Sequence, residues 1–245
     1  MTNKAAFFDI DGTLFRDSLL VKHFEILKDN KVIDDKRWNE EVVPYYEKFK
    51  NRKGAYEDYL DKVSIAYQEG IIGVSQKDLF KYADEVVGKE KDRIYLVTKK
   101  AIEKYIEDGY YVFFISGSPE YLVKPFGKLY NATHSIASKY IMENNKFSGE
   151  VLPMWDSRNK IRSINYLADK YDLDLKKCHA YGDTNGDLSM MRAVGNAHII
   201  NPTFELLNNC NKDKKLKNKT KVHIERKDVN YEFMLKDMNI DFKQF

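Results

Sequence analysis

An apolar run near the start of the chain ends in two acids and a glycine: Ala5-Ala6-Phe7-Phe8-Asp9-Ile10-Asp11-Gly12-Thr13-Leu14. A continuous apolar run is typical of a parallel strand that is buried on both faces. Side chains two positions apart on an extended segment point the same way, so Asp9 and Asp11 can face one small volume at the strand end. One carboxylate can then attack a substrate while the other transfers protons. Alone, the pair is a weak signal, because acids after strands also cap turns and helices.

Further apolar runs of strand length follow, with helical segments between them. The strand-like runs cover residues 110–115, 178–181 and 197–200. Apolar residues at helical spacing are found at 98–107, 119–130, 160–171 and 188–194. This alternation predicts an α/β protein with a doubly wound, Rossmann-like parallel sheet. Residues 134–140 and 146–151 are separated by Glu143-Asn144-Asn145 and predict a hairpin.

The segment that follows the first strand has a different pattern. Apolar residues recur three and four positions apart at 19–27, 38–49 and 56–67, and no convincing strand interrupts them. We therefore expect a core formed by residues 1–14 and 96–245, with a helical segment inserted at 15–95. Near the C-terminus, the lysine-rich stretch 212–221 predicts a solvated loop, with polyanion binding as the alternative. The last twenty residues predict a helix.

A second group of acids stands behind another predicted strand, in Gly182-Asp183-Thr184-Asn185-Gly186-Asp187. Ser116 ends the run 110–115 in the same way. Ligands of open parallel sheets bind outside the carboxyl ends of the strands, so we expect these residues to meet the Asp9 pair there. Three close carboxylates would repel one another unless a divalent cation neutralised them. A hard ion with oxygen ligands, such as Mg²⁺, suits this chemistry.

The composition argues against several other classes of protein. Lysine and arginine number 41 against 38 acids, and the resulting formal charge of +3 does not indicate a nucleic-acid partner. No apolar stretch approaches the roughly 18 residues of a membrane helix, so we expect no membrane association. Cys178 and Cys210 have no metal-ligand spacing, which is typical of a reducing compartment. We expect a cytoplasmic protein that acts on a small molecule, and its oligomeric state stays open.

Four motifs in a fixed order resemble those of the haloacid dehalogenase superfamily, and within it the phosphoserine-phosphatase-like branch. They are Phe7-Phe8-Asp9-Ile10-Asp11-Gly12-Thr13-Leu14, then Phe114-Ile115-Ser116-Gly117-Ser118, then Lys160 on a helix, then Tyr181-Gly182-Asp183-Thr184-Asn185-Gly186-Asp187-Leu188. Together they span most of the chain, and a chance match in this order is very improbable. The resemblance implies a phosphatase with a helical cap that closes over the site and contacts the leaving group.

The resemblance also implies a role for each acid of the motifs. Asp9 would be the nucleophile and would carry an aspartyl-phosphate intermediate. Asp11 would protonate the departing alcohol and later deprotonate the attacking water. The implied Mg²⁺ would be bound by the Asp9 carboxylate, the backbone carbonyl of Asp11 and the Asp183 carboxylate. Asp187 would order a water bound to that metal.

Three further residues would bind the phosphoryl group. Ser116 and the amide of Gly117 would hold its oxygens, and Lys160 would offset its charge. The whole set is needed, because phosphate-monoester hydrolysis requires accelerations approaching about 10²¹, whereas one acid/base group supplies roughly 10² to 10⁴.

Two substrate contacts of phosphoserine phosphatases are absent. The family's amine-binding glutamate stands nine residues after the nucleophile, where this chain has Ser18 beside Asp17. Its cap arginine falls within residues 60–64, and an ungapped match places Val63 there; the neighbouring Lys62 cannot make the same bidentate contact. We therefore expect a small phosphomonoester other than phosphoserine. Lipid-derived and amino-alcohol phosphates stay open, and the cap has an aromatic character that could pack against such groups, given by Trp38, Tyr45, Tyr46, Phe49 and Tyr56.

Other functions stay open at this point. A phosphotransferase would pass the phosphoryl group from Asp9 to another alcohol. A phosphoserine phosphatase with altered cap contacts, a regulatory protein without turnover and a phosphatase of nucleic-acid ends are further alternatives. The last would need a basic face beyond the lysine-rich stretch.

Overall fold

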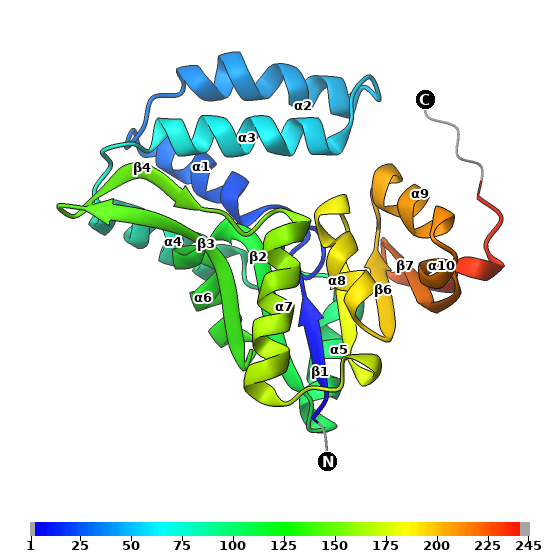
Figure 1. Ribbon diagram of the computed structural model, residues 1–245. Coiled ribbons are helices and arrows are strands. Elements are labelled where there is room, and N and C mark those ends of the chain that lie inside the picture. Colours follow the sequence, from blue (N-terminus) through cyan, green and yellow to red (C-terminus); the bar gives the residue numbers. More distant parts are fainter. Residues whose placement is uncertain (1–2, 241–245) are drawn as a thin grey trace.

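The computed structural model describes residues 3–240, and an eight-stranded sheet runs through the molecule with helices on both faces (Figure 1). The strand order is β4-β3-β2-β1-β5-β6-β7-β8. The inner strands β3, β2, β1, β5, β6 and β7 pair in parallel. The edge strands β4 and β8 pair antiparallel with β3 and β7. The strands are β1 (Ala5–Phe8), β2 (Tyr111–Pro119), β3 (His134–Glu143), β4 (Lys146–Leu152), β5 (His179–Gly182), β6 (Asn196–Ile200), β7 (Thr220–Arg226) and β8 (Val229–Met234).

The helices fall into two groups, one inserted between β1 and β2 and one between the later strands. The first group is α1 (Leu19–Asp29), a π-helical turn (Trp38–Val42), α2 (Val43–Lys50), α3 (Tyr56–Gly70), α4 (Gln76–Glu90) and α5 (Leu96–Glu107). The second group is α6 (Glu120–Leu129), α7 (Ser157–Tyr171), α8 (Leu188–Ala193), α9 (Phe204–Lys212) and α10 (Lys214–Lys219). No helix in residues 3–240 is long and apolar enough to cross a membrane.

Strand β1 lies between β2 and β5 and contributes side chains to the core on both faces of the sheet. Successive strand residues point to opposite faces. Ala5 and Phe7 pack against α7 and α8, whereas Ala6 and Phe8 pack against α5 and α6. All four are fully buried, which explains why this strand reads as an uninterrupted apolar run.

The inserted helices α1, α3 and α4 have a hydrophobic core of their own, which includes Phe24, Val63 and Leu79. Tyr140 and Phe147 of the β3–β4 hairpin also belong to this cluster. The hairpin therefore joins the insertion to the sheet, and the expected domain boundaries at residues 15 and 95 stay a prediction.

A buried chain of hydrogen bonds also links the insertion to the sheet side. The His23 Nε2 atom lies 3.0 Å from the Leu79 carbonyl oxygen, its Nδ1 atom lies 2.6 Å from the Tyr67 hydroxyl, and that hydroxyl lies 2.6 Å from the Tyr121 hydroxyl. A carbonyl only accepts, so a neutral His23 donates from Nε2 and accepts at Nδ1. Tyr67 then donates to His23 and accepts from Tyr121 of α6, which fixes the direction of every bond.

The C-terminal region differs from the sequence-based expectation. The helix expected over the last twenty residues is wrong within the described part, because β8 pairs there with β7 to form an antiparallel edge. Residues 241–245 lie outside the described residues. The lysine-rich stretch 212–221 was expected as a loop, but it contains α10 and the first residues of β7.

Candidate active site

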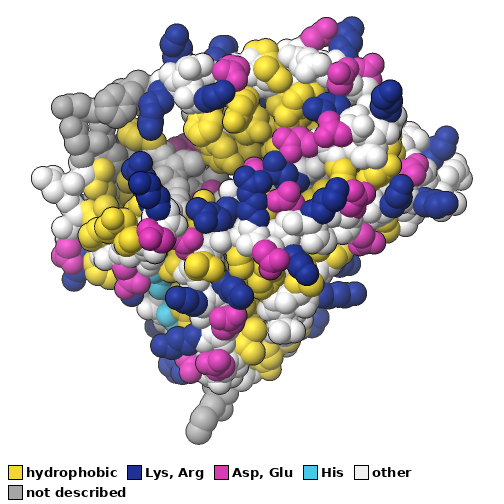
Figure 2. All heavy atoms as spheres, turned by 180° about the vertical axis from the view of Figure 1, so that it is seen from behind, with side chains coloured by type: hydrophobic (Ala, Val, Ile, Leu, Met, Phe, Trp, Pro, Cys, Tyr) yellow, Lys and Arg dark blue, Asp and Glu magenta, His cyan; other side chains and the backbone are white. Residues whose placement is uncertain are grey.

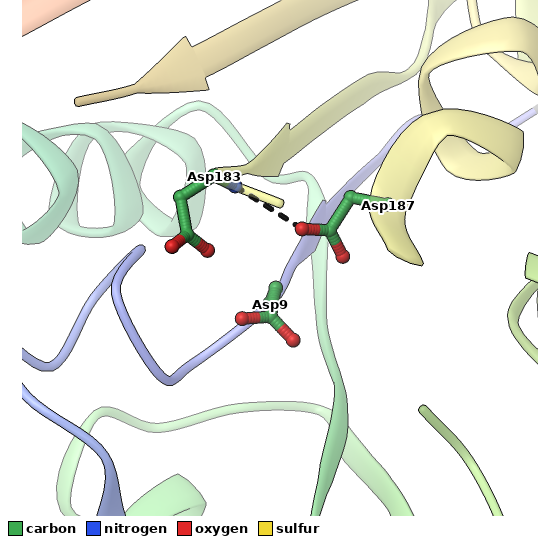
Figure 3. Close-up of side chains that lie close together, drawn as sticks. All are labelled: Asp9, Asp183 and Asp187. Carbon is green, nitrogen blue, oxygen red and sulfur yellow. Dashed lines mark hydrogen bonds between the residues drawn. The ribbon is translucent and has the colours of Figure 1, made fainter. Parts of the chain in front are cut away.

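Three carboxylates meet beyond the carboxyl ends of β1 and β5. The backbone amide of Asp9 donates to the Tyr181 carbonyl at 3.0 Å, which brings the two strand ends together. Oxygen atoms of Asp9, Asp183 and Asp187 lie within 4.8 Å of one another, and all three residues are buried. In Figure 3 the side chains of Asp9 and Asp183 approach from different loops, and Asp187 comes from the segment before α8. Residues 174 positions apart thus share one small volume, as their strand positions predicted.

The loop between Gly182 and Asp187 is closed by its last residue. Asp187 Oδ2 accepts from the backbone amides of Asp183 at 3.1 Å and Thr184 at 3.2 Å, and the first of these bonds is drawn in Figure 3. A Cβ atom at Gly182 would lie 2.4 Å from Asp187 Cβ, so only glycine fits there. The carboxylate of Asp187 is therefore fixed by the backbone that it closes.

Lys160 lies in the first turn of α7 and points its ammonium group at this cluster. The helix is capped by Asp156, which accepts from the Asn159 amide at 2.8 Å. Lys160 Nζ lies 2.7 Å from Asp9 Oδ1 and 2.5 Å from Asp187 Oδ1. Burial alone would lower the pKa of Lys160, but the charges of Asp187 and Asp9 outweigh it and raise this pKa. Lys160 is therefore a charged lysine inside the molecule, whereas its sequence position suggests an exposed one.

The charge of the cluster is only partly balanced. Burial raises the pKa of Asp9, against the lowering effect of Lys160, and burial together with Asp9 and Asp187 raises the pKa of Asp183. One ammonium group faces three carboxylates. Buried oxygen ligands with excess negative charge are the donors that bind a hard divalent cation, so these residues fit a metal ion.

Gly12 and Thr13, which follow β1, lie next to the Asp183 carboxylate. Thr13 Oγ1 donates to Asp183 Oδ1 at 3.0 Å. Gly12 has a φ angle of 76°, which disfavours residues with a Cβ atom, and a Cβ atom there would lie 2.0 Å from Asp183 Oδ2. The glycine of the first motif is thus required both for its backbone conformation and for the space of a carboxylate.

The Asp11 carboxylate lies apart from the group of three. Its Oδ1 accepts from the Leu19 amide at 2.6 Å at the start of α1, and its Oδ2 accepts from the Ser118 hydroxyl. Burial raises the pKa of Asp11 to about 6, although the bond from Ser118 opposes this rise. Asp11 therefore stands between the insertion and the end of β2, next to the site that the three carboxylates form.

Ser116 and Gly117 lie at the end of β2, beside β1. Phe114 pairs with Phe8, so Ser116 falls just beyond the last residue of β1. Ser116 is fully buried and its Oγ accepts from the Ser118 amide at 3.1 Å. A Cβ atom at Gly117 would lie 2.8 Å from Trp155 Cβ. The residues predicted to hold the phosphoryl group thus lie at the same edge of the sheet, and their role stays a prediction.

The structure adds three supporting residues that sequence reasoning did not assign. Thr13 binds Asp183, Ser118 binds Asp11, and the Ser138 hydroxyl donates to the Gly117 carbonyl at 2.7 Å. Thr13 and Ser118 stand inside the recognised motifs, so their position was a usable signal. Ser138 follows no motif, and only the pairing of β2 with β3 brings it to the site.

The sheet, the inserted helices and the buried acids define an α/β protein with an acidic site at the carboxyl edge of its parallel strands. The family model of haloacid dehalogenase-like hydrolases matches residues 6–192, more than half of the chain, and the chain belongs to this family. The resemblance inferred from the four motifs is confirmed.

Two curated relatives come from Mycobacterium tuberculosis. A protein named as a probable phosphatase is 38% identical over 88 residues, which cover 36% of this chain and 31% of that protein. A phosphoserine phosphatase is 24% identical over 218 residues, which cover 82% of this chain and 66% of that protein. The chain therefore spans less than two thirds of the first relative.

Two solved structures share the fold. A Bordetella pertussis protein of unknown function superposes with a TM-score of 0.68 at 15% identity, covering 86% of this chain and 96% of that chain. A phosphoserine phosphatase solved as an analogue of its phospho-aspartyl intermediate superposes with a TM-score of 0.58 at 19% identity, covering 85% of this chain and 91% of that chain. This likeness confirms the expected α/β fold with its mostly parallel sheet and helical insertion.

Proposed function

We propose that the chain is a Mg²⁺-dependent phosphomonoester hydrolase that forms an aspartyl-phosphate on Asp9. The observation that carries this proposal is the position of the Asp9 carboxylate, which accepts from the Lys160 ammonium group at 2.7 Å and lies in one small volume with the carboxylates of Asp183 and Asp187. The ammonium group of Lys160 favours the charged, nucleophilic form of this carboxylate, against the opposing effect of burial. Membership in a hydrolase family and the relative named as a probable phosphatase support the same activity.

In the first step, one oxygen of Asp9 attacks phosphorus, and the bond between phosphorus and the alcohol oxygen breaks. Asp11 donates a proton to the departing alcohol. In the second step, water attacks the phosphorylated Asp9 while Asp11 accepts its proton, and phosphate leaves. The Leu19 amide and the Ser118 hydroxyl donate to the two oxygens of the Asp11 carboxylate and so position it for this transfer.

The phosphoryl oxygens would be held by Ser116, the Gly117 amide and Lys160. Mg²⁺ would be held by the Asp9 and Asp183 carboxylates and the Asp11 backbone carbonyl. Asp187 would order a water bound to the ion. When bound, the ion stabilises the negative charge that develops on the phosphoryl oxygens. The single lysine offsets only part of the charge of the three buried acids, so the donor set fits this ion.

Phosphoserine is not the substrate that these side chains favour. The Ser18 side chain caps α1 and accepts from the Val21 amide at 3.4 Å, so it replaces the family's amine-binding acid with a structural group. Val63 is buried in the core of the insertion, and Lys62 Nζ lies over the Tyr45 ring at 5.2 Å from its centroid. Neither side chain supports recognition of a substrate carboxylate.

Phosphate release from a panel of phosphate esters, with and without Mg²⁺, tests the proposed activity. We expect turnover with Mg²⁺, and Asp9→Asn should abolish it. Rapid quenching in acid should trap phosphoprotein on the native chain and none on Asp9→Asn. Asp84→Asn, which changes an exposed aspartate of α4, is the matched control and should keep full activity. Undiminished turnover in Asp9→Asn would overturn the proposal.

A further inference from the structure

We infer that Ser138 of β3 is a positioning residue for the phosphoryl group: its hydroxyl fixes the peptide bond between Gly117 and Ser118, and through it the direction of the Gly117 amide. The inference rests on the proposed function and adds to its site a residue that would not contact the substrate. Ser138 lies outside the four motifs and reaches the site from the neighbouring strand.

Strand β2 leaves regular pairing with β3 at the place where the phosphoryl group would bind. The register shifts between Ser116 and Pro119, whose partners on β3, Ala137 and Ser138, are consecutive residues. Residues 117–118 of β2 are therefore extra. Such a bulge leaves its residues outside the ladder, and bulges are frequent next to active sites, where they redirect the backbone. The polar backbone groups of the bulge need partners other than the neighbouring strand's backbone.

Side-chain hydroxyls bind both polar groups of the peptide bond between Gly117 and Ser118. Ser116 Oγ accepts from the Ser118 amide at 3.1 Å, and Ser138 Oγ donates to the Gly117 carbonyl at 2.7 Å. The two bonds hold the plane of this peptide from both ends. They also restrict Gly117, which as a glycine has more conformational freedom than other residues. Since Ser116 Oγ accepts from an amide, its own proton stays available for a phosphoryl oxygen.

Ser138 is held in turn by the loop between β4 and α7. Its Oγ accepts from the Met154 amide at 3.0 Å. An amide only donates, so the single proton of this hydroxyl goes to the Gly117 carbonyl. The loop, residues 153–156, leads directly into α7, the helix that carries Lys160. One hydroxyl thus joins the bulge of β2 to the segment that precedes the proposed phosphoryl-binding lysine.

The same loop also lies against Gly117 and Gly186. A Cβ atom at Gly117 would lie 2.8 Å from Trp155 Cβ, and one at Gly186 would lie 2.8 Å from the Trp155 carbonyl oxygen. Ser157, the first residue of α7, donates from its hydroxyl to the Gly186 carbonyl at 3.3 Å. The loop therefore contacts the backbone of both motifs. Donors that are fixed in this way before a substrate binds are the ones that stabilise developing charge.

Ser138 lies away from the surface that a substrate can reach. Figure 2 shows a hollow beside the hydrophobic side chains on the upper part of the molecule, on the side of the insertion. Ser138 is fully buried, and both partners of its hydroxyl are backbone groups. It would therefore act on the phosphoryl group only through Gly117, which distinguishes its role from that of Ser116.

Calorimetric titration of inorganic phosphate into the chain with Mg²⁺ tests the inference. Ser138→Ala should raise the Kd for phosphate by about tenfold, and it should lower kcat/KM by a similar factor for every ester because all esters share the phosphoryl group. Mg²⁺ affinity without phosphate should stay unchanged, since Asp9 and Asp183 hold the proposed metal site. Ser138→Thr keeps the hydroxyl and should keep phosphate affinity. Ser138→Cys has a similar volume and only a weak donor, so it replaces Ser138→Ala if that variant does not fold.

Ser148→Ala is the matched control, because Ser148 makes the same kind of link in the same hairpin. Its hydroxyl donates to the Ile141 carbonyl at 3.0 Å and accepts from the Glu150 amide at 3.2 Å. Ser148→Ala should lower the urea midpoint and leave the Kd for phosphate unchanged. Equal Kd values in the native chain and Ser138→Ala would overturn the inference. The same holds for equal changes in Ser138→Ala and Ser148→Ala, or for parallel losses of phosphate and Mg²⁺ affinity in Ser138→Ala.

The titration requires no turnover, so it separates the two proposals. Phosphate binding that weakens in Ser138→Ala, in a native chain that hydrolyses no ester, would support the positioning role and count against the proposed function. A native chain that binds no phosphate with Mg²⁺ would overturn both.

Discussion

Lys160 Nζ lies 2.7 Å from Asp9 Oδ1, although 151 residues separate the two in the chain. The contact depends on the relative placement of β1 and α7, two elements that pack on each other through Phe7, Ile164 and Leu167. The hydrophobic core thus sets the position of a charge pair in the proposed active site.

Removal of this lysine should affect both stability and activity. Lys160→Met leaves Asp9 and Asp187 buried without their cation, which costs about 3–5 kcal/mol when one partner of a buried pair is lost. The loss of a phosphoryl-binding charge should lower kcat by roughly 10²-fold or more. Urea unfolding without Mg²⁺ measures the first effect, and phosphate release measures the second. Lys170→Met, an exposed lysine of α7, should change neither, and an unchanged unfolding midpoint in Lys160→Met would contradict the buried pair.

Two glycines with positive φ separate backbone strain from crowding. Gly12→Ala and Gly73→Ala both place a Cβ atom at a φ angle near 76° or 79°, with a strain of about 1–2 kcal/mol. Only at Gly12 does the new atom collide with Asp183 Oδ2, while the space around Gly73 is open. Gly12→Ala should therefore lose more stability than Gly73→Ala and should also lose its response to Mg²⁺. Similar unfolding free energies for the two variants would show that Asp183 moves aside freely.

Mg²⁺ should stabilise the fold through the group of three carboxylates. At a concentration one hundred times Kd, a ligand of the folded state adds about 2.7 kcal/mol, which is roughly 5–10 °C in Tm for a chain of this size. Asp183→Asn should abolish most of this shift, and it should raise Tm without metal because one of the repelling charges is gone. Thermal unfolding with EDTA and with Mg²⁺ gives both values. Asp84→Asn should respond to Mg²⁺ like the native chain.

Stability should fall in mild acid because His23 is buried in its neutral form. Burial lowers the pKa of His23 to about 4, against the partial opposing effect of the Leu79 carbonyl, while the unfolded chain has a value near 6.5. The unfolded state therefore binds more protons between these values. The contribution of His23 is complete above about pH 6.5 and decreases towards pH 4 by up to about 1.4 kcal/mol per pH unit.

Urea unfolding between pH 4.5 and 7.5 measures this slope. His23→Gln should make it shallower, whereas His134→Gln, at a half-exposed position of β3, should change it less. The buried His198 and His223 have lowered pKa values too, so part of the slope should persist in His23→Gln. Identical slopes in the native chain and His23→Gln would mean that the unfolded state holds this histidine in a similar environment.

The parts of the structure that follow from local patterns were predictable from the sequence. The run Ala5 to Phe8 alternates between two buried faces, and its apolar character alone indicated a parallel strand. The acids after β1 and β5 meet because both strands end at the same edge, which the doubly wound pattern implies.

The remaining features depend on tertiary contacts that no local pattern contains. Lys160 has the spacing of an exposed helix residue, and only the packing of α7 on β1 buries it. Strand β7 was missed although Thr220–Arg226 alternates between apolar and polar residues, because its first two residues belong to the lysine-rich stretch that was expected to be a loop.

The bonds from Tyr121 through Tyr67 and His23 to the Leu79 carbonyl have a consequence for how the insertion is seated. Apolar contacts have no preferred direction, so they fix the register of packed helices less strictly than a hydrogen bond does. A donor aimed at a single acceptor does not, because a displaced helix would leave buried polar atoms without partners. The polar chain therefore sets the register of α1, α3 and α4 against α6, and with it the height at which α3 begins above the strand ends.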